Sequence, residues 1–264
     1  MTIAIVIIAA MILLYFIGLF GLATAKSDNS IVDIGWGVGF MLVAWWSYAL
    51  FADGSPQQTV ATILVTIWGL RLSGHIFERN HGRDEDWRYK RWRDEWGKWF
   101  LVRSFFQIYM LQGLLMLLVS LPIIFINTAD ADINSWLLAA GVAIWVGGFT
   151  FEVLADYHLR DHITHKRGGI LKSGVWSLTR HPNYFGEAML WWGISVIALG
   201  VSASLMSPVW WWLVGPITIT MLVRYVSGVP ILEKKYADNE EFQEYAAATP
   251  IFIPWPKLGR EPEK

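Results

Sequence analysis

The stretch SLTRHPNYFGEAMLWWG, residues 177–193, organises this chain because it leads from a basic loop into an apolar helix. Pro182 has no backbone N–H, and its φ angle suits the first turn of a helix. The residue before a proline is pushed away from the helical region of backbone space. The sequence therefore predicts a helix that begins near Pro182 and runs through Trp191 and Trp192.

The start of this helix has the features of a ligand site. Its free N–H groups and positive dipole end favour an anion such as phosphate, and we expect Arg180 and His181 beside them to contribute. Asn183 and Glu187 are four residues apart and share one helix face, while Gly186 between them allows close approach. An amide and a carboxylate just inside a membrane helix are costly, and such residues are usually functional.

Composition places the chain in a membrane. Of its 264 residues 55% are hydrophobic and only 16% are charged. A soluble domain of this composition would expose a large apolar surface. The formal net charge of −1 gives no sign of nucleic-acid binding, and with no cysteine the chain forms no disulfide.

Apolar runs predict an all-α, polytopic membrane protein with about seven transmembrane helices and a cofactor pocket on the cytoplasmic side. A bilayer core requires roughly 20 apolar residues per helix. The predicted spans are residues 3–23, 31–51, 59–74, 105–126, 136–155, 188–201 and 209–228. We expect a single domain over residues 1–264, with the cofactor half mainly in residues 134–255.

Loop charges predict the orientation. Lysine and arginine cluster in residues 75–98, in residues 156–181 and in the tail after residue 228, whereas the opposite loops carry aspartates without basic residues. Basic loops face the cytoplasm, so we expect the N-terminus outside and the C-terminus inside, in a bacterial inner membrane. Tryptophans near span ends are typical of interfacial belts. They are Trp45, Trp46, Trp136, Trp191, Trp192 and Trp210 to Trp212.

A second polar face precedes the basic loop. Glu152, Asp156 and Arg160 follow one another at intervals of four and line one helix face. They could form a cofactor cradle or a salt-bridged helix end, and spacing alone leaves both open. Lys166 and Lys172 could likewise serve a phosphate or only set the topology.

Two further sets of residues need an interpretation. Arg71 lies inside the third predicted span and should face a polar cavity or a carboxylate, for which Asp33 is a candidate partner. The histidines of residues 158–165 have a spacing that can bind metal, but we interpret them as solvated and predict no metal site.

The run Arg180 to Glu187, RHPNYFGE, resembles the signature of the steroid 5-alpha-reductase superfamily, and of its bacterial DUF1295 group in particular. The 5-alpha-reductases and sterol C14-reductases are relatives. A shorter version of the motif is shared with isoprenylcysteine and phospholipid methyltransferases. Residues 229–236 and 249–255 resemble the superfamily's C-terminus, which folds back under the cofactor pocket. The resemblance spans roughly residues 31–255.

The resemblance implies an NADPH site. It assigns Asp156 and Arg160 to the cofactor and places Asn183 and Glu187 at its nicotinamide and substrate end. Lys166 and Lys172 would face the 2′-phosphate. The remaining cofactor residues that we expect are Arg71, which matches a family arginine, together with Arg83, Glu152, Arg180 and His181. Trp68 stands where the 5-alpha-reductases have a tyrosine, so a 3-oxo-steroid substrate is not implied.

The leading functional hypothesis is an NADPH-dependent reductase of a C=C bond in a lipophilic substrate that enters from the membrane. Glu187, Tyr184 and Asp33 are the candidate acids. The alternative is an S-adenosylmethionine-dependent membrane methyltransferase, and a third hypothesis is a transporter or lipid-binding protein. The expected partners are the substrate and membrane lipid, without nucleic acid, and we expect a monomer.

Overall fold

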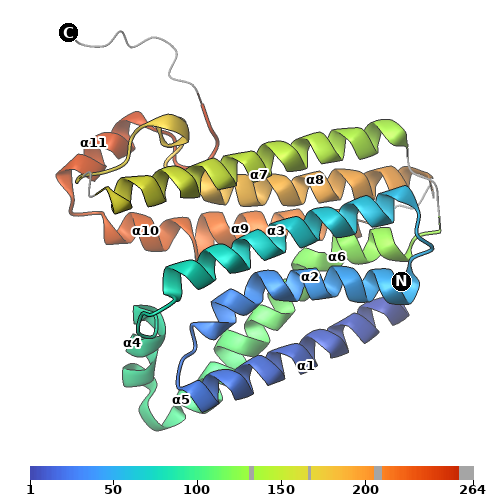
Figure 1. Ribbon diagram of the computed structural model, residues 1–264, viewed down its shortest axis with the longest axis horizontal. Helices are drawn as coiled ribbons and strands as arrows, with labels where there is room; N and C mark the ends of the chain where they lie inside the picture. The colour runs from blue at the N-terminus through green and yellow to red at the C-terminus, as the bar shows by residue number, and fades with distance from the viewer. Residues whose placement is uncertain (131–133, 166–167, 205–209, 256–264) are drawn as a thin grey trace. The chain divides into compact units, whose positions relative to one another are not determined.

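The structure, a computed structural model, describes residues 1–130, 134–165, 168–204 and 210–255 (Figure 1). Within those residues the chain is helical and forms no strand. The long helices are α1 Thr2–Lys26, α2 Ile31–Phe51, α3 Pro56–Asn80, α6 Leu111–Thr128, α7 Ser135–Thr164, α8 Pro182–Ser204 and α9 Trp211–Met221. The shorter ones include α4 Trp87–Trp96, α5 Phe100–Ser104, α10 Val229–Lys235, α11 Glu240–Ala248 and the π-helical turns η2 Phe105–Met110 and η4 Leu222–Val226.

Seven segments of the described chain are long and apolar enough to cross a membrane, which confirms the predicted fold class and number of spans. The second span begins and ends where the sequence predicts, at Ile31 and Phe51. The third and fifth are longer than predicted, because α3 continues to Asn80 and α7 continues to Thr164. The predicted spans end where the apolar run ends, whereas the helical hydrogen bonds continue into the polar residues beyond it.

The chain forms two compact units. Unit 1 comprises Met1–Leu138 and Ser195–Gly215, and unit 2 comprises Ala139–Ile194 and Pro216–Lys264. Most of the residues predicted to form the cofactor half belong to unit 2. The single domain expected from the sequence stays a prediction.

In unit 1, glycines bring α2 and α3 into backbone contact. A Cβ atom at Gly37 would collide with the carbonyl oxygen of Gly69, and a Cβ atom at Gly69 would lie 2.5 Å from the carbonyl oxygen of Gly37. Ser73 then donates a hydrogen bond of 2.8 Å to the carbonyl of Ile34 on the facing helix. Close approach through small residues is how helices gain packing where lipid provides no hydrophobic drive.

Unit 1 also holds a buried amide. The side chain of Asn127 on α6 is fully buried and donates to the carbonyl of Ala44 at 3.2 Å and to Ser47 Oγ at 2.9 Å. The same amide nitrogen lies 3.3 Å from Thr62 Oγ1 on α3. One asparagine therefore ties α2, α3 and α6 together within an apolar interior.

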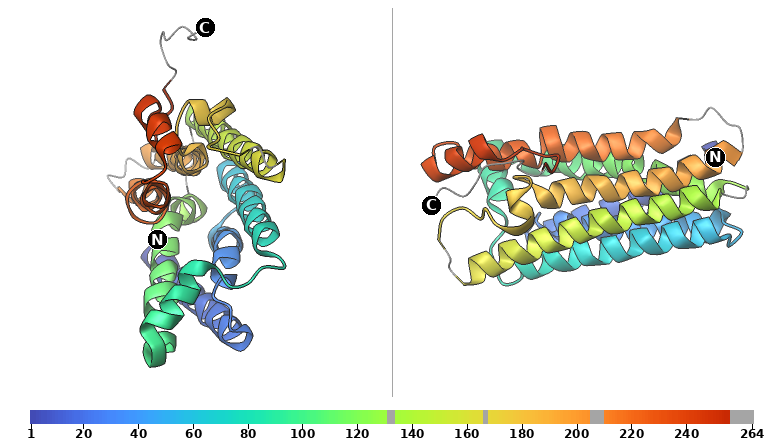
Figure 2. Two further views of the ribbon diagram at one scale, coloured as in Figure 1. Left: turned by 90° about the vertical axis from the view of Figure 1, so that its left-hand side faces the viewer. Right: turned by 90° about the horizontal axis from the view of Figure 1, so that it is seen from above.

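In unit 2, α7 and α8 lie side by side (Figures 1 and 2), and they pack against each other through two glycine contacts. A Cβ atom at Gly186 would lie 2.5 Å from the carbonyl oxygen of Gly148, and one at Gly193 would lie 2.7 Å from the carbonyl oxygen of Gly141. The two glycines of each helix are seven residues apart, two helical turns, so they lie on one stripe. The close approach predicted at Gly186 is confirmed.

The tryptophan belt is only partly as predicted. Trp136 and Trp210 are 84% and 71% exposed, as residues at a membrane interface should be. Trp191, which the sequence assigns to the same belt, is fully buried. The prediction is wrong there because a position near the end of an apolar run does not show which face of α8 points inward. Neighbouring Trp192 is the exposed member of the pair.

The glycine contact between α7 and α8 predicts a strong effect of one methyl group. Gly186→Ala should lower the free energy of unfolding by about 1–3 kcal/mol, because the added carbon overpacks against backbone that cannot move aside. Gly74→Ala on α3 is the matched control, since a Cβ atom there meets nothing within 4 Å and alanine favours the helix. Thermal unfolding of both variants in detergent checks this, and equal melting temperatures would contradict it.

Candidate functional site

The candidate site is built where the polar ends of α7 and α8 meet. Asn183, in the first turn of α8, donates a hydrogen bond of 3.3 Å from Nδ2 to Oδ1 of Asp156 on α7. The amide oxygen of Asn183 accepts a hydrogen bond of 3.0 Å from the backbone N–H of Tyr184. This bond orients the amide so that its nitrogen points toward Asp156. The sequence placed both residues in one site, and the structure brings them together.

Two more acidic residues lie one helical turn from this pair along α7 and α8. Glu152 lies one turn before Asp156 on α7 and is only 3% exposed. The backbone nitrogen of Glu152 would lie 2.7 Å from a Cβ atom at Gly186. The close approach of α7 and α8 at this glycine therefore holds the backbone of Glu152 against α8. Glu187 is half-buried and lies one turn after Asn183 on α8. Three acidic residues thus lie at, or one helical turn from, the Asn183–Asp156 contact along α7 and α8.

The two basic residues of the motif bind the chain's tail. Arg180 contacts both carboxylate oxygens of Glu233 on α10, from Nε at 3.0 Å and from Nη2 at 3.1 Å. Its Nη1 donates to the carbonyls of Ala246 at 2.7 Å and Thr249 at 3.2 Å. His181 Nε2 lies 2.7 Å from Oε1 of the same Glu233. Arg180 and His181, predicted beside a phosphate, therefore have a carboxylate as their partner here.

The tail runs back along the loop that precedes α8. The backbone N–H of Arg180 donates to the carbonyl of Pro250 at 2.9 Å, and Thr179 Oγ1 donates to the carbonyl of Phe252 at 2.9 Å. Tyr245 donates its hydroxyl to the carbonyl of Trp176, and burial raises the pKa of Tyr245. These bonds confirm that the tail folds back onto the segment that begins the site.

Lys172 in the basic loop between α7 and α8 is also paired. Lys172 Nζ lies 2.9 Å from Oε1 of Glu241 on α11, and Glu241 accepts the backbone N–H of Ile170 at 3.0 Å. The hydrogen bond from Lys172 and the one from Ile170 hold the pKa of Glu241 below its ordinary value. Arg160 is exposed on the last turns of α7, and Lys166 lies outside the described residues.

Two of the three histidines at the end of α7 and just after it make local contacts. His162 Nε2 lies 3.2 Å from the carbonyl of Gly169, and His165 Nδ1 lies 3.0 Å from Oδ1 of Asp161. Among residues 1–130, 134–165, 168–204 and 210–255, no group of three His, Asp or Glu side chains is placed to hold a metal ion.

The remaining predicted residues belong to unit 1. Asp33 pairs with Arg88 Nη2 at 2.8 Å and accepts the hydroxyl of Tyr89 at 2.6 Å. Both partners are donors, so Asp33 acts as an acceptor in this contact. Arg71 is half-buried on α3, and Arg83 is exposed between α3 and α4.

Sequence reasoning missed the residues that complete these contacts. Glu233, Glu241 and Tyr245 lie 50 or more residues from their partners in the chain, and no local pattern marks them. Arg88 lies in the basic segment of residues 75–98, where its charge predicts topology alone. The one available indication was the resemblance of residues 229–255 to a tail that folds back.

The fold and the site define a helical, multi-pass membrane protein whose polar residues gather at the ends of two glycine-packed helices. A family model described as "Protein of unknown function (DUF1295)" matches residues 19–249. The chain therefore belongs to the DUF1295 family. Comparison with curated proteins gave no match, and comparison with solved structures gave none either.

His181 predicts how stability depends on pH. Burial holds the pKa of His181 below its ordinary value of 6.5, although the hydrogen bond to Glu233 opposes the shift. Below pH 6.5 the unfolded chain therefore binds a proton that the folded chain resists, and the folded state loses stability as the pH falls.

Melting temperatures measured from about pH 7 to about pH 5 test this, because the titration of an ordinary histidine lies in that window. The wild type should lose more stability than His181→Gln over the range. His165→Gln, at a side chain that is 60% exposed, should follow the wild type. Parallel curves for the wild type and His181→Gln would contradict the assignment.

Proposed function

We propose that this chain is an NADPH-dependent reductase that saturates a C=C bond in a lipophilic substrate. The observation that carries the proposal is the Asn183–Asp156 hydrogen bond, formed where α7 and α8 meet at glycines. It joins two parts of the chain that resemble the cofactor residues of the steroid 5-alpha-reductase superfamily. Amide and carboxylate groups are suited to the carboxamide and ribose hydroxyls of a nicotinamide nucleotide.

The residues present suit such a cofactor. Asp156 and the buried Glu152 offer acceptors for ribose hydroxyls, and the exposed Arg160 offers a cation one turn further along α7. Lys172 can also serve a phosphate, because its ion pair with Glu241 is exposed and such pairs are weak. Arg180 and His181 support the site indirectly by holding the tail against the start of α8.

The cofactor would supply a hydride to one alkene carbon, and the chain would supply the proton to the other carbon. Glu187 and Tyr184 are the candidate donors, because both lie in the first two turns of α8 beside Asn183. Asp33 is less suited, since Arg88 and Tyr89 hold it as an acceptor. The apolar spans suit a substrate that enters from lipid, and we propose a cytoplasmic site in a bacterial membrane.

Nucleotide binding tests the cofactor. NADPH should raise the melting temperature of the purified protein more than NADH, because Arg160 and Lys172 can contact the additional phosphate. Ligand linkage gives about 2.7 kcal/mol of stabilisation at a hundredfold excess over the dissociation constant. Asp156→Asn should lose most of this shift, and the exposed Asp238→Asn should keep it. Stabilisation by S-adenosylmethionine, without an effect of NADPH, would replace the proposal with the methyltransferase alternative.

Glu187→Gln separates binding from proton transfer. It keeps the side chain's shape but removes the ionisable group, so it should bind NADPH as the wild type does. Turnover of an α,β-unsaturated lipid ketone, followed by NADPH oxidation, should fall by roughly 10²–10⁴-fold. Glu244→Gln, at an exposed site on α11, is the control. A folded and fully active Glu187→Gln protein would remove Glu187 from the reaction and leave Tyr184 as the acid.

A further inference from the structure

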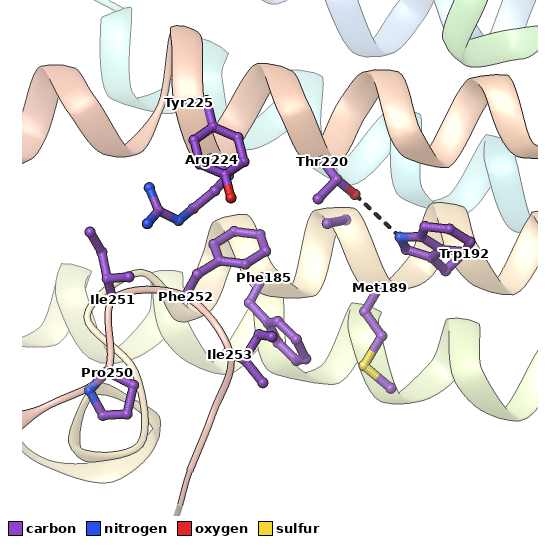
Figure 3. A pocket seen from close by; sticks show the side chains of 11 residues that line it. Phe185, Met189, Trp192, Thr220, Arg224, Tyr225, Pro250, Ile251, Phe252 and Ile253 are labelled. Atoms are coloured by element: carbon purple, nitrogen blue, oxygen red, sulfur yellow. Dashed lines mark hydrogen bonds between the residues drawn. The ribbon is translucent and has the colours of Figure 1, made fainter.

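A second candidate site lies on the outside of unit 2. It is a groove of about 630 Å³ between α8, the α9–η4 helix and residues 250–253 of the tail (Figure 3). Phe185, Met189 and Trp192 from α8 line one wall, and Phe252 and Ile253 from the tail line another. Its walls are mainly aromatic and aliphatic, which distinguishes it from the polar site at Asn183.

The groove and the candidate cofactor site occupy different faces of α8. Phe185, Ala188, Met189 and Trp192 recur at intervals of three and four and form one stripe along the helix. Asn183 and Glu187 lie outside that stripe and do not line the groove. A ligand in the groove therefore does not depend on the reductase assignment.

The groove is open to the surroundings of the protein. Tyr225 and Ile253 on its rim are 59% and 68% exposed, and Trp192 is 36% exposed. These residues belong to, or lie against, helices that are long and apolar enough to cross a membrane. The medium outside an apolar, membrane-depth surface is lipid, so lipid is the molecule that has direct access to the groove.

One charge lies at an end of the groove. Arg224 is half-buried on the π-helical turn η4, and its guanidinium carbon lies 4.6 Å from the centre of the Tyr225 ring. Among the residues that the structure describes, Arg224 has no hydrogen-bond or salt-bridge partner. A cation at this depth is costly without a counter-charge, and π-helical turns are frequent at functional positions.

At the other end of the groove, the polar atoms are already hydrogen-bonded within the protein. Trp192 donates its indole N–H to Thr220 Oγ1 at 3.2 Å (Figure 3). Thr220 donates in turn to the carbonyl of Pro216 at 2.6 Å. The polar atoms of Trp192 and Thr220 thus satisfy one another. Arg224 follows Thr220 by one helical turn, so the groove changes from cationic to apolar along its length.

We propose that this groove binds an anionic membrane phospholipid. The lipid phosphate contacts the guanidinium of Arg224 at the interface, and one acyl chain lies along Phe185, Met189 and Trp192. A phosphate supplies the counter-charge that Arg224 lacks among the described residues, in a geometry that a guanidinium recognises well. Phe185 and Trp192 are seven positions apart on α8, which gives the acyl chain a path of about 10 Å.

Native mass spectrometry of the detergent-purified protein tests the proposal. Phosphatidylglycerol and phosphatidylcholine with identical acyl chains are titrated separately. The wild type should bind phosphatidylglycerol about tenfold more tightly, because phosphatidylcholine has the same phosphate but also a choline cation that offsets the attraction to Arg224. Arg224→Gln should lose this preference, and Arg224→Lys should keep part of it. Lys235→Gln, which removes an exposed charge on α10, should bind as the wild type does.

A second variant tests the acyl chain. Met189→Trp places a larger side chain in the groove and should weaken binding of both lipids. Inorganic phosphate should not displace phosphatidylglycerol if the acyl chain contributes to binding. Equal binding of the two lipids by the wild type would overturn the proposal. So would an unchanged preference in Arg224→Gln, or displacement by inorganic phosphate alone. If Arg224→Gln does not fold, Arg224→Lys decides on the charge, because its preference should fall below that of the wild type, and Met189→Trp decides on the acyl chain.

Discussion

The backbone contact between α7 and α8 is the constraint on which unit 2 depends. Gly148 meets Gly186, and Gly141 meets Gly193, so the order along one helix is reversed along the other and the helices are antiparallel. At such a distance no side chain separates the backbones, and polar residues at the helix ends come within hydrogen-bonding range. The Asn183–Asp156 bond and the buried position of Glu152 follow from it. The glycine of the RHPNYFGE motif is therefore a packing requirement.

A second constraint fixes the start of α8. Arg180 and His181 share the carboxylate of Glu233, and Arg180 also binds two carbonyls near the end of α11. The side chains of Arg180 and Glu233 are only 11% and 21% exposed, so loss of either would leave a charge in a poorly solvated place. The first two residues of the motif thus hold the tail, and in the proposed function the chemistry falls to Asn183 and Glu187.

Local patterns predicted what depends on local chemistry. The seven spans follow from apolar length, the start of α8 follows from Pro182, and the close approach follows from Gly186. Pairs between distant residues were beyond such patterns, because the sequence alone does not show that Glu233 lies 2.7 Å from His181. The inward orientation of Trp191 and the unpaired position of Arg224 among the described residues likewise depend on packing.

Hydrogen exchange with and without nucleotide tests most directly that the ends of α7 and α8 form one nucleotide site. Saturating NADPH should slow amide exchange in residues 156–165 and 168–185, because a bound nucleotide would restrain the ends of both helices and the loop between them. Exchange in residues 52–58 of unit 1 should not change. The account is contradicted if NADPH leaves residues 156–185 unaffected, or if S-adenosylmethionine alone slows their exchange.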